Sequence, residues 1–166
     1  MSPDQGRSGR KPGPPRWVYR TLWALHRAGY AISGGRLGLR SAANDRLGTL
    51  RLRTTGRRSG QERATMLYYL PAGAGAAVVA SNAGSASPPA WWLNLQAQPR
   101  AEIDLPAGPR RVLAREATGA ERERLWGRFV DQLADYERYA AHAGREIPIV
   151  ILEPVAEQPV VEEADA

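Results

Sequence analysis

The sequence predicts an α+β protein, mainly β, in which about six mostly antiparallel strands form a partly open barrel with flanking helices. Residues 49–54 alternate leucine with arginine, which is the period of a strand with one buried face. Further short apolar runs follow, and turns containing glycine or proline separate most of them. Short turns join antiparallel strands, whereas parallel strands need long crossovers, so the pattern favours hairpins.

The strands and a short helix are placed by apolar runs and by proline. The strands are expected at residues 49–54, 64–70, 76–81, 101–105, 110–117 and 147–152. Pro88 or Pro89 begins a short helix that Pro99 ends, because proline fits the first turn of a helix and disfavours helical geometry in the residue before it.

The segment after Thr118 predicts a helix that runs to near Gly144. Thr118 and Glu121 have the spacing of a capping box, in which each side chain satisfies a free N–H group of the first turn. Apolar side chains then recur on one helical face, at Leu125, Phe129, Leu133 and Tyr136. Tyr136 and Tyr139 are three residues apart and are expected to reach the same side.

The N-terminal segment 16–28 predicts a basic amphipathic helix. Its opposite faces are formed by Arg16, Arg20 and Arg27 and by Val18, Leu22 and Leu25. Such a helix can lie on an anionic membrane surface or pack on its own domain with its arginines in water, and the sequence leaves both open. Residues 1–15 are predicted to be a disordered basic arm, 16–154 the folded domain and 155–166 a disordered acidic tail.

Composition narrows the class of partner. The net charge is +6, and all but one of the basic residues are arginine, which suits forked contacts with phosphate or carboxylate. There is no cysteine, and His26 and His142 are the only histidines, so no metal site is predicted. The basic residues lack a helix-turn-helix or zinc-finger context, so no nucleic-acid partner is expected.

Targeting signals are likewise not evident in the sequence. No run reaches the ~18 apolar residues of a membrane span, and the N-terminus lacks the apolar core of a secretory signal. We therefore expect a cytoplasmic protein, located at the inner face of the cell membrane if residues 16–28 bind lipid. The sequence does not indicate an oligomeric state.

A basic loop joins the first two predicted strands. It carries two glycines, which permit a tight turn and let backbone N–H groups approach an anion. Its polar side chains are suited to phosphate and belong to Arg57, Arg58, Ser59 and Arg63. The alternative is a solvated hairpin loop. The loop lacks the pattern of nucleotide triphosphatases, so it is not that phosphate site.

A second polar stretch, Ser81-Asn82-Ala83-Gly84, follows a predicted buried strand. Its amides and the Ser81 hydroxyl are expected to face a ligand at the strand end. Trp91, Trp92 and Asn94 come next, and aromatic faces beside exposed amides suit a planar heterocycle. The alternative is that one or both tryptophans fill the core.

Four motifs in this order resemble the deazaflavin-dependent nitroreductase family of actinobacteria. They are Thr-Thr-Gly-Arg-Arg-Ser-Gly-Gln-Glu-Arg at 54–63, Ala-Ser-Asn-Ala-Gly at 80–84, Pro-Ala-Trp-Trp-Leu-Asn-Leu-Gln-Ala-Gln-Pro at 89–99 and Arg-Glu-Ile-Pro-Ile-Val-Ile-Leu-Glu-Pro at 145–154. The resemblance covers roughly residues 16–154. It implies a split β-barrel that binds reduced coenzyme F420, a hydride-carrying deazaflavin with a phosphate and an oligoglutamate tail.

The resemblance also implies roles for individual residues. The coenzyme would be bound by Arg57, Arg58, Ser59, Gly60, Arg63, Leu67, Tyr68, Ala80, Ser81, Asn82, Ala83, Gly84, Trp91 and Asn94. The catalytic candidates are Ser81, Tyr136 and Tyr139, and either tyrosine would donate a proton or orient the substrate. The family presents tyrosines three residues apart on its last helix, and Leu133 stands at one of those positions.

The predicted function is that of an oxidoreductase. A hydride would pass from reduced coenzyme F420 to a small electrophile, such as a quinone, a nitroaromatic or an activated alkene. One alternative is a flavoprotein of the same barrel type with FMN, whose phosphate would fit the loop equally well. The other is a non-enzymatic carrier of coenzyme or lipid, since a barrel pocket can hold a ligand without transforming it.

Overall fold

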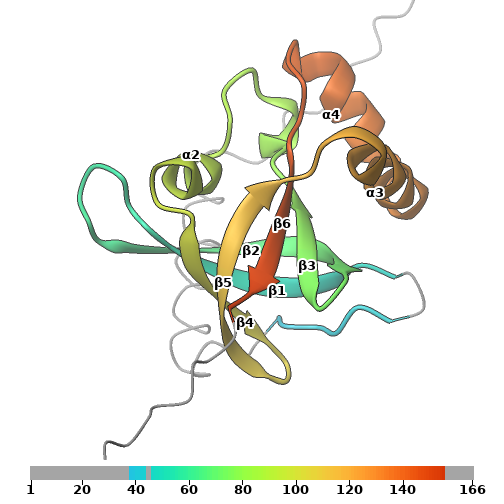
Figure 1. Cartoon of the computed structure of the whole chain (residues 1–166). Coiled ribbons are helices and arrows are strands. Elements are labelled where there is room, and N and C mark those ends of the chain that lie inside the picture. The colour runs from blue at the N-terminus through green and yellow to red at the C-terminus, as the bar shows by residue number, and fades with distance from the viewer. Residues whose placement is uncertain (1–37, 44–45, 156–166) are drawn as a thin grey trace, which may run out of the picture. The chain divides into compact units, whose positions relative to one another are not determined.

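The computed structural model describes residues 38–43 and 46–155, and these belong to one unit of the chain, Gly38–Ala166 (Figure 1). The strands are β1 (Gly48–Thr55), β2 (Glu62–Ala72), β3 (Gly75–Val79), β4 (Arg100–Leu105), β5 (Gly108–Glu116) and β6 (Ile149–Pro154). The helices are α2 (Ala90–Ala97), α3 (Gly119–Gln132), α4 (Asp135–Ala143) and the short 3-10 helix η1 (Asn82–Gly84). The predicted antiparallel, mainly β architecture with flanking helices is confirmed.

The barrel is closed, so the expectation of a partly open one was wrong. Its strand order is β1-β2-β3-β6-β5-β4, and closure comes from antiparallel pairing of β1 with β4. That ladder is short, pairing Arg51–Arg53 with Glu102–Asp104. Arg53 points away from the core and forms ion pairs with Glu102 and, at 2.8 Å, with Asp104. The closing contact joins segments about fifty residues apart, which local periodicity does not encode.

Two apolar clusters explain the strand patterns. The alternating leucines of β1, Leu50 and Leu52, lie inside the barrel with Trp91 and Trp92 of α2. A second cluster lies between the barrel and the helices α3 and α4, and includes Phe129. The apolar run of β3 is buried on both faces, because Ala76 and Val78 join the first cluster and Ala77 and Val79 the second. The helices therefore cover the outer face of β3 (Figure 1).

The single helix predicted from residue 118 to near Gly144 is two helices. The break falls at Leu133, whose backbone is extended (φ −152°, ψ 93°), and α4 then begins at Asp135. Leu133 and Tyr136 still pack beside Leu125 and Phe129, as the apolar spacing predicted.

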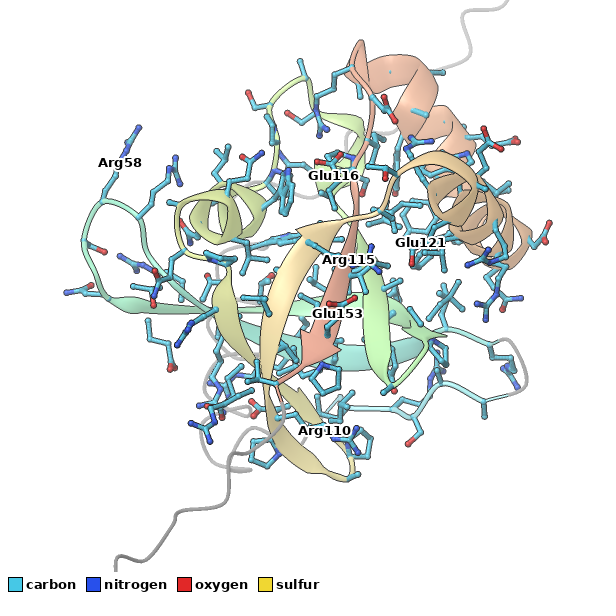
Figure 2. The ribbon with its side chains drawn as sticks, viewed as in Figure 1. Arg58, Arg110, Arg115, Glu116, Glu121 and Glu153 are labelled. Atoms are coloured by element: carbon cyan, nitrogen blue, oxygen red, sulfur yellow. The ribbon has the colours of Figure 1, made fainter. Side chains whose placement is uncertain are left out.

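The predicted capping box is also absent. Thr118 is the N-cap residue of α3, but its side chain makes no capping hydrogen bond. Glu121 instead accepts two hydrogen bonds from Arg115, at 2.6 and 3.0 Å, and Arg115 also donates to Glu153 at 2.7 Å (Figure 2). The hydrogen bonds from Arg115 hold the pKa of Glu121 below its usual 4.5. These contacts tie α3 to β5 and β6.

Several predictions concern residues outside the described part of the chain. They are the basic arm 1–15, the amphipathic helix 16–28 and the tail from residue 156 onward. Within residues 38–43 and 46–155, no helix is long and apolar enough to cross a membrane.

Candidate functional site

The loop between β1 and β2 is a tight turn whose amides are mostly used internally. The N–H groups of Ser59 and Gly60 donate to the Gly56 carbonyl at 3.2 and 2.7 Å, and the N–H of Gly56 donates to Gln61 at 2.8 Å. The N–H of Gln61 donates to the Ser59 hydroxyl at 3.4 Å. The expectation that this loop turns several backbone N–H groups toward an anion was therefore wrong, and Gly60 (φ +67°) and Ser59 maintain the turn.

The same loop does present arginine side chains. Arg57, Arg58 and Arg63 are exposed, and among the described residues no carboxylate lies within ion-pair distance of their guanidinium groups. Arg58 extends from the loop away from the barrel (Figure 2). Arg63 donates to the Gln61 side chain at 3.4 Å. Guanidinium groups that face no carboxylate among the described residues suit a phosphate, so the side chains of this loop remain the candidate phosphate site.

Asn94 of α2 fixes the position of Arg57. The Asn94 side chain is buried, and its Oδ1 accepts from the backbone N–H of Arg57 at 3.2 Å and from Arg57 Nη1 at 3.3 Å. Its Nδ2 donates to the buried Thr54 hydroxyl at 3.2 Å. Asn94 was predicted to contact the coenzyme, but three of its hydrogen bonds join α2 to β1 and to the arginine loop.

The stretch 81–84 has an unusual backbone. Ser81 is right-handed helical (φ −71°, ψ −34°), whereas Asn82, Ala83 and Gly84 have φ of 49°, 52° and 79°. A right-handed residue followed by a left-handed one makes a concavity of N–H groups that binds anions or carbonyl oxygens. The N–H groups of Ser81, Asn82 and Ala83 find no acceptor within the described part of the chain. Within the described part of the chain, three consecutive backbone donors are therefore free here, whereas in the loop segment 56–61 only the N–H of Arg58 finds no acceptor.

Arg145, to which no role was assigned from the sequence, holds this stretch in place. Its guanidinium donates to four carbonyl oxygens of the segment 80–87. The acceptors are Ala80 (3.1 Å), Ser81 (3.3 Å), Ser85 (3.3 Å) and Ser87 (3.5 Å). Asn82 closes the same segment by donating from Nδ2 to Ser87 at 3.0 Å. No sequence pattern identifies an arginine that binds carbonyls some sixty residues away.

Leu67 and Tyr68, both predicted to line the coenzyme ring, lie on opposite faces of β2. Leu67 packs against the cluster inside the barrel, and Tyr68 is 50% exposed on the outer face. Side chains alternate along a strand, so the two cannot approach one ligand from the same side. Ala80 is fully buried inside the barrel.

The two candidate tyrosines of α4 differ in environment. Tyr136 is buried in the cluster below α3 and α4, where its ring meets Phe129 edge-to-face at 5.6 Å. Burial, with the nearby phenols of Tyr139 and Tyr68, raises the pKa of Tyr136 to about 12. Tyr139 is only half-buried, its ring lies 6.1 Å from that of Tyr136, and its backbone contacts Gly84 of η1.

The tryptophans of α2 belong to the core. Trp91 and Trp92 are 9% and 6% exposed, and their rings meet edge-to-face at 6.4 Å inside the barrel cluster. The side chain of Trp91, predicted to bind coenzyme, therefore anchors α2 to the barrel. That anchoring places Asn94 against the arginine loop.

Comparison with known proteins identifies the family of the chain. The family model described as F420H(2)-dependent quinone reductase matches residues 23–154. The F420H(2)-dependent quinone reductase Rv1261c of Mycobacterium tuberculosis is 35% identical over 146 residues, which span 82% of this chain and 95% of the relative.

Solved structures show the same fold. One, titled as an F420-H2 dependent reductase, has a TM-score of 0.58 and 31% identity, covering 63% of this chain and 93% of the other. Another, titled as a domain-swapped dimer, has a TM-score of 0.62 and 27% identity, covering 81% of this chain and 99% of the other. The chain belongs to the F420H(2)-dependent quinone reductase family, a family of oxidoreductases.

Proposed function

We propose that this protein reduces quinones by two electrons at a site formed by the 81–84 stretch, the arginine loop and the exposed end of Tyr139. The observation that carries the proposal is the row of three N–H groups, at Ser81, Asn82 and Ala83, that find no acceptor among the described residues. A deazaflavin presents ring carbonyls and nitrogens that need such donors. When bound, the reduced coenzyme supplies the hydride.

The residues present fit this coenzyme at two separate points. The free donors at 81–83 match the acceptor edge of its ring system, and Ser81 adds a half-exposed hydroxyl with no partner in the described part of the chain. Arg57, Arg58 and Arg63 match its phosphate, and Asn94 fixes the first of them in position. The arginine side chains, not the loop amides, supply the phosphate contacts.

On the substrate side, Tyr139 is the proton donor we propose. Reduction of a quinone to a hydroquinone takes one hydride and one proton, and a phenol is protonated at neutral pH. Tyr136 is less suited because it is 5% exposed and its raised pKa makes it a weaker acid. Its ring instead packs against that of Tyr139 and orients it.

We also propose acceptors other than quinones. A nitroaromatic or an activated alkene also accepts a hydride and then a proton, so the same donor and the same tyrosine would serve. Quinones are the acceptors to test first, because the family to which the chain belongs reduces quinones. The carrier hypothesis does not agree with membership of an enzyme family.

The test is anaerobic oxidation of reduced coenzyme F420 by menadione, with nitroaromatic and enone acceptors in parallel. We expect quinone-dependent oxidation at a rate proportional to enzyme, and binding of F420 in preference to FMN in fluorescence titrations. Tyr139→Phe should lower turnover by roughly 10²-fold with coenzyme affinity retained, whereas Tyr136→Phe should retain turnover. Binding of FMN alone, or no turnover with any acceptor, would overturn the proposal.

A further inference from the structure

Arg145 contacts the carbonyl side of the peptide units whose N–H groups we assign to the coenzyme. It donates to the oxygens of Ala80 and Ser81. Those carbonyls share their peptide units with the N–H groups of Ser81 and Asn82. Because a trans peptide unit is planar, its C=O and N–H bonds point in opposite directions. A guanidinium that holds both carbonyls on one side therefore aims both N–H groups toward the other.

The same contact strengthens the two donors. A hydrogen bond from a cation to a peptide oxygen polarises the unit and makes its N–H group a better donor. Among the described residues, no carboxylate lies within ion-pair distance of Arg145 to neutralise this effect. Ser81 and Asn82 thus present N–H groups that are both oriented and polarised.

The backbone at this point needs such support. Asn82 and Ala83 are left-handed. Asparagine adopts this conformation readily, but alanine holds it only when its surroundings impose it. Arg145 binds carbonyls on both sides of these residues, at Ser81 and at Ser85. The guanidinium therefore spans the strained turn.

We propose that Arg145 is a positioning residue that sets the two N–H groups against the acceptor edge of the coenzyme ring. This inference rests on the proposed function for its ligand. Arg145 lies between α4 and β6, directly after the helix that carries Tyr139, so one side chain fixes the 81–84 stretch relative to the proposed proton donor. Lysine cannot replace it, because a single ammonium lacks the planar fork that reaches several carbonyls.

The experiment compares Arg145→Ala, Arg145→Lys and the matched control Arg122→Ala. Arg122 lies in the same region and binds the Ile147 carbonyl at 3.3 Å and Glu146 at 2.5 Å, but within the described part of the chain it makes no hydrogen bond to residues 80–87. Two readouts are used: hydrogen exchange of residues 80–87 without coenzyme, and the Kd for coenzyme F420 by fluorescence titration.

Both Arg145 variants should exchange faster in residues 80–87 and bind coenzyme about tenfold or more weakly, whereas Arg122→Ala should do neither. Millimolar guanidinium chloride, far below denaturing concentrations, should restore affinity to Arg145→Ala and leave Arg145→Lys and the wild type unchanged. Rescue separates positioning from a general loss of structure.

Wild-type coenzyme affinity in Arg145→Ala would overturn the inference, as would equal losses in Arg145→Ala and Arg122→Ala. If Arg145→Ala does not fold, Arg145→Lys decides by the same two readouts. If the wild-type protein does not bind coenzyme F420, the proposed function fails. In that case, hydrogen exchange of residues 80–87 still shows whether Arg145 orders this segment.

Discussion

The buried hydrogen bond between Asn94 and Thr54 should be measurable as a coupling energy. Both residues are almost inaccessible, at 4% and 2% exposure, and Asn94 Nδ2 donates to the Thr54 hydroxyl at 3.2 Å. Asn94→Leu removes that donor and leaves a buried hydroxyl and the Arg57 N–H without their partner. An unsatisfied buried group costs about 1–3 kcal/mol, and Arg57 is exposed enough to bind water instead, so we expect a loss near 2 kcal/mol.

A double-mutant cycle isolates the pair. Thr54→Val removes the hydroxyl but keeps the branched shape, so the double variant leaves no orphaned group at this point. The unfolding free energies of the four proteins, from urea titrations, should give a coupling of about 1–2 kcal/mol. Coenzyme affinity should fall in Asn94→Leu and in the double variant, because both remove the side chain that holds Arg57 in position. Additive single changes would refute the network, and so would wild-type affinity in Asn94→Leu.

Three further variants test the backbone strain at Ala83 and the stability of the protein at acid and at alkaline pH. Ala83→Gly should raise the free energy of unfolding by up to about 1 kcal/mol, because the strain relieved at a left-handed alanine exceeds the entropy that glycine adds to the unfolded chain. A lower free energy of unfolding in urea titrations would contradict the left-handed backbone at this residue. Glu121 has a lowered pKa, so its bond to Arg115 stabilises the protein above pH 4.5 and is lost as pH falls through that lowered value. Glu121→Gln should reduce the fall in Tm between neutral and acid pH. An unchanged dependence of Tm on acid pH would count against the contact. Tyr136 has a raised pKa, so its contribution to the free energy of unfolding is complete below pH 10.0 and declines as the pH rises toward 12. Tyr136→Phe should remove that decline, which is about 2–3 kcal/mol. If the variant and the wild type lose stability equally at alkaline pH, the phenol is not buried.

The pattern of apolar residues along the sequence predicted most of the fold. The alternation at Leu50 and Leu52 and the continuous apolar run of β3 each predicted a strand, because side-chain period reports directly on which faces are buried. The break between α3 and α4 was missed, since Leu133 keeps its place in the apolar cluster whether its backbone is helical or extended. Barrel closure was missed because pairing of β1 with β4 is set by the whole sheet.

The sequence indicated which segments form the candidate site but not the hydrogen bonds within it. The arginines of the β1–β2 loop and the 81–84 stretch were predicted as two polar features, because composition and turn residues mark them. Which amides remain free depends on the path of the backbone, and the Gly56 carbonyl takes the N–H groups of Ser59 and Gly60. The role of Arg145 depends on carbonyls supplied by a distant segment, and one sequence holds no signal for that.

The most direct test of the account is an amide NMR titration with coenzyme F420. We expect the N–H resonances of Ser81 and Asn82 to move downfield as these groups gain an acceptor. The resonances of Ser59 and Gly60 should not move, because their N–H groups stay hydrogen-bonded to the Gly56 carbonyl. Downfield movement of the Ser59 and Gly60 resonances, with those of Ser81 and Asn82 unchanged, would contradict it.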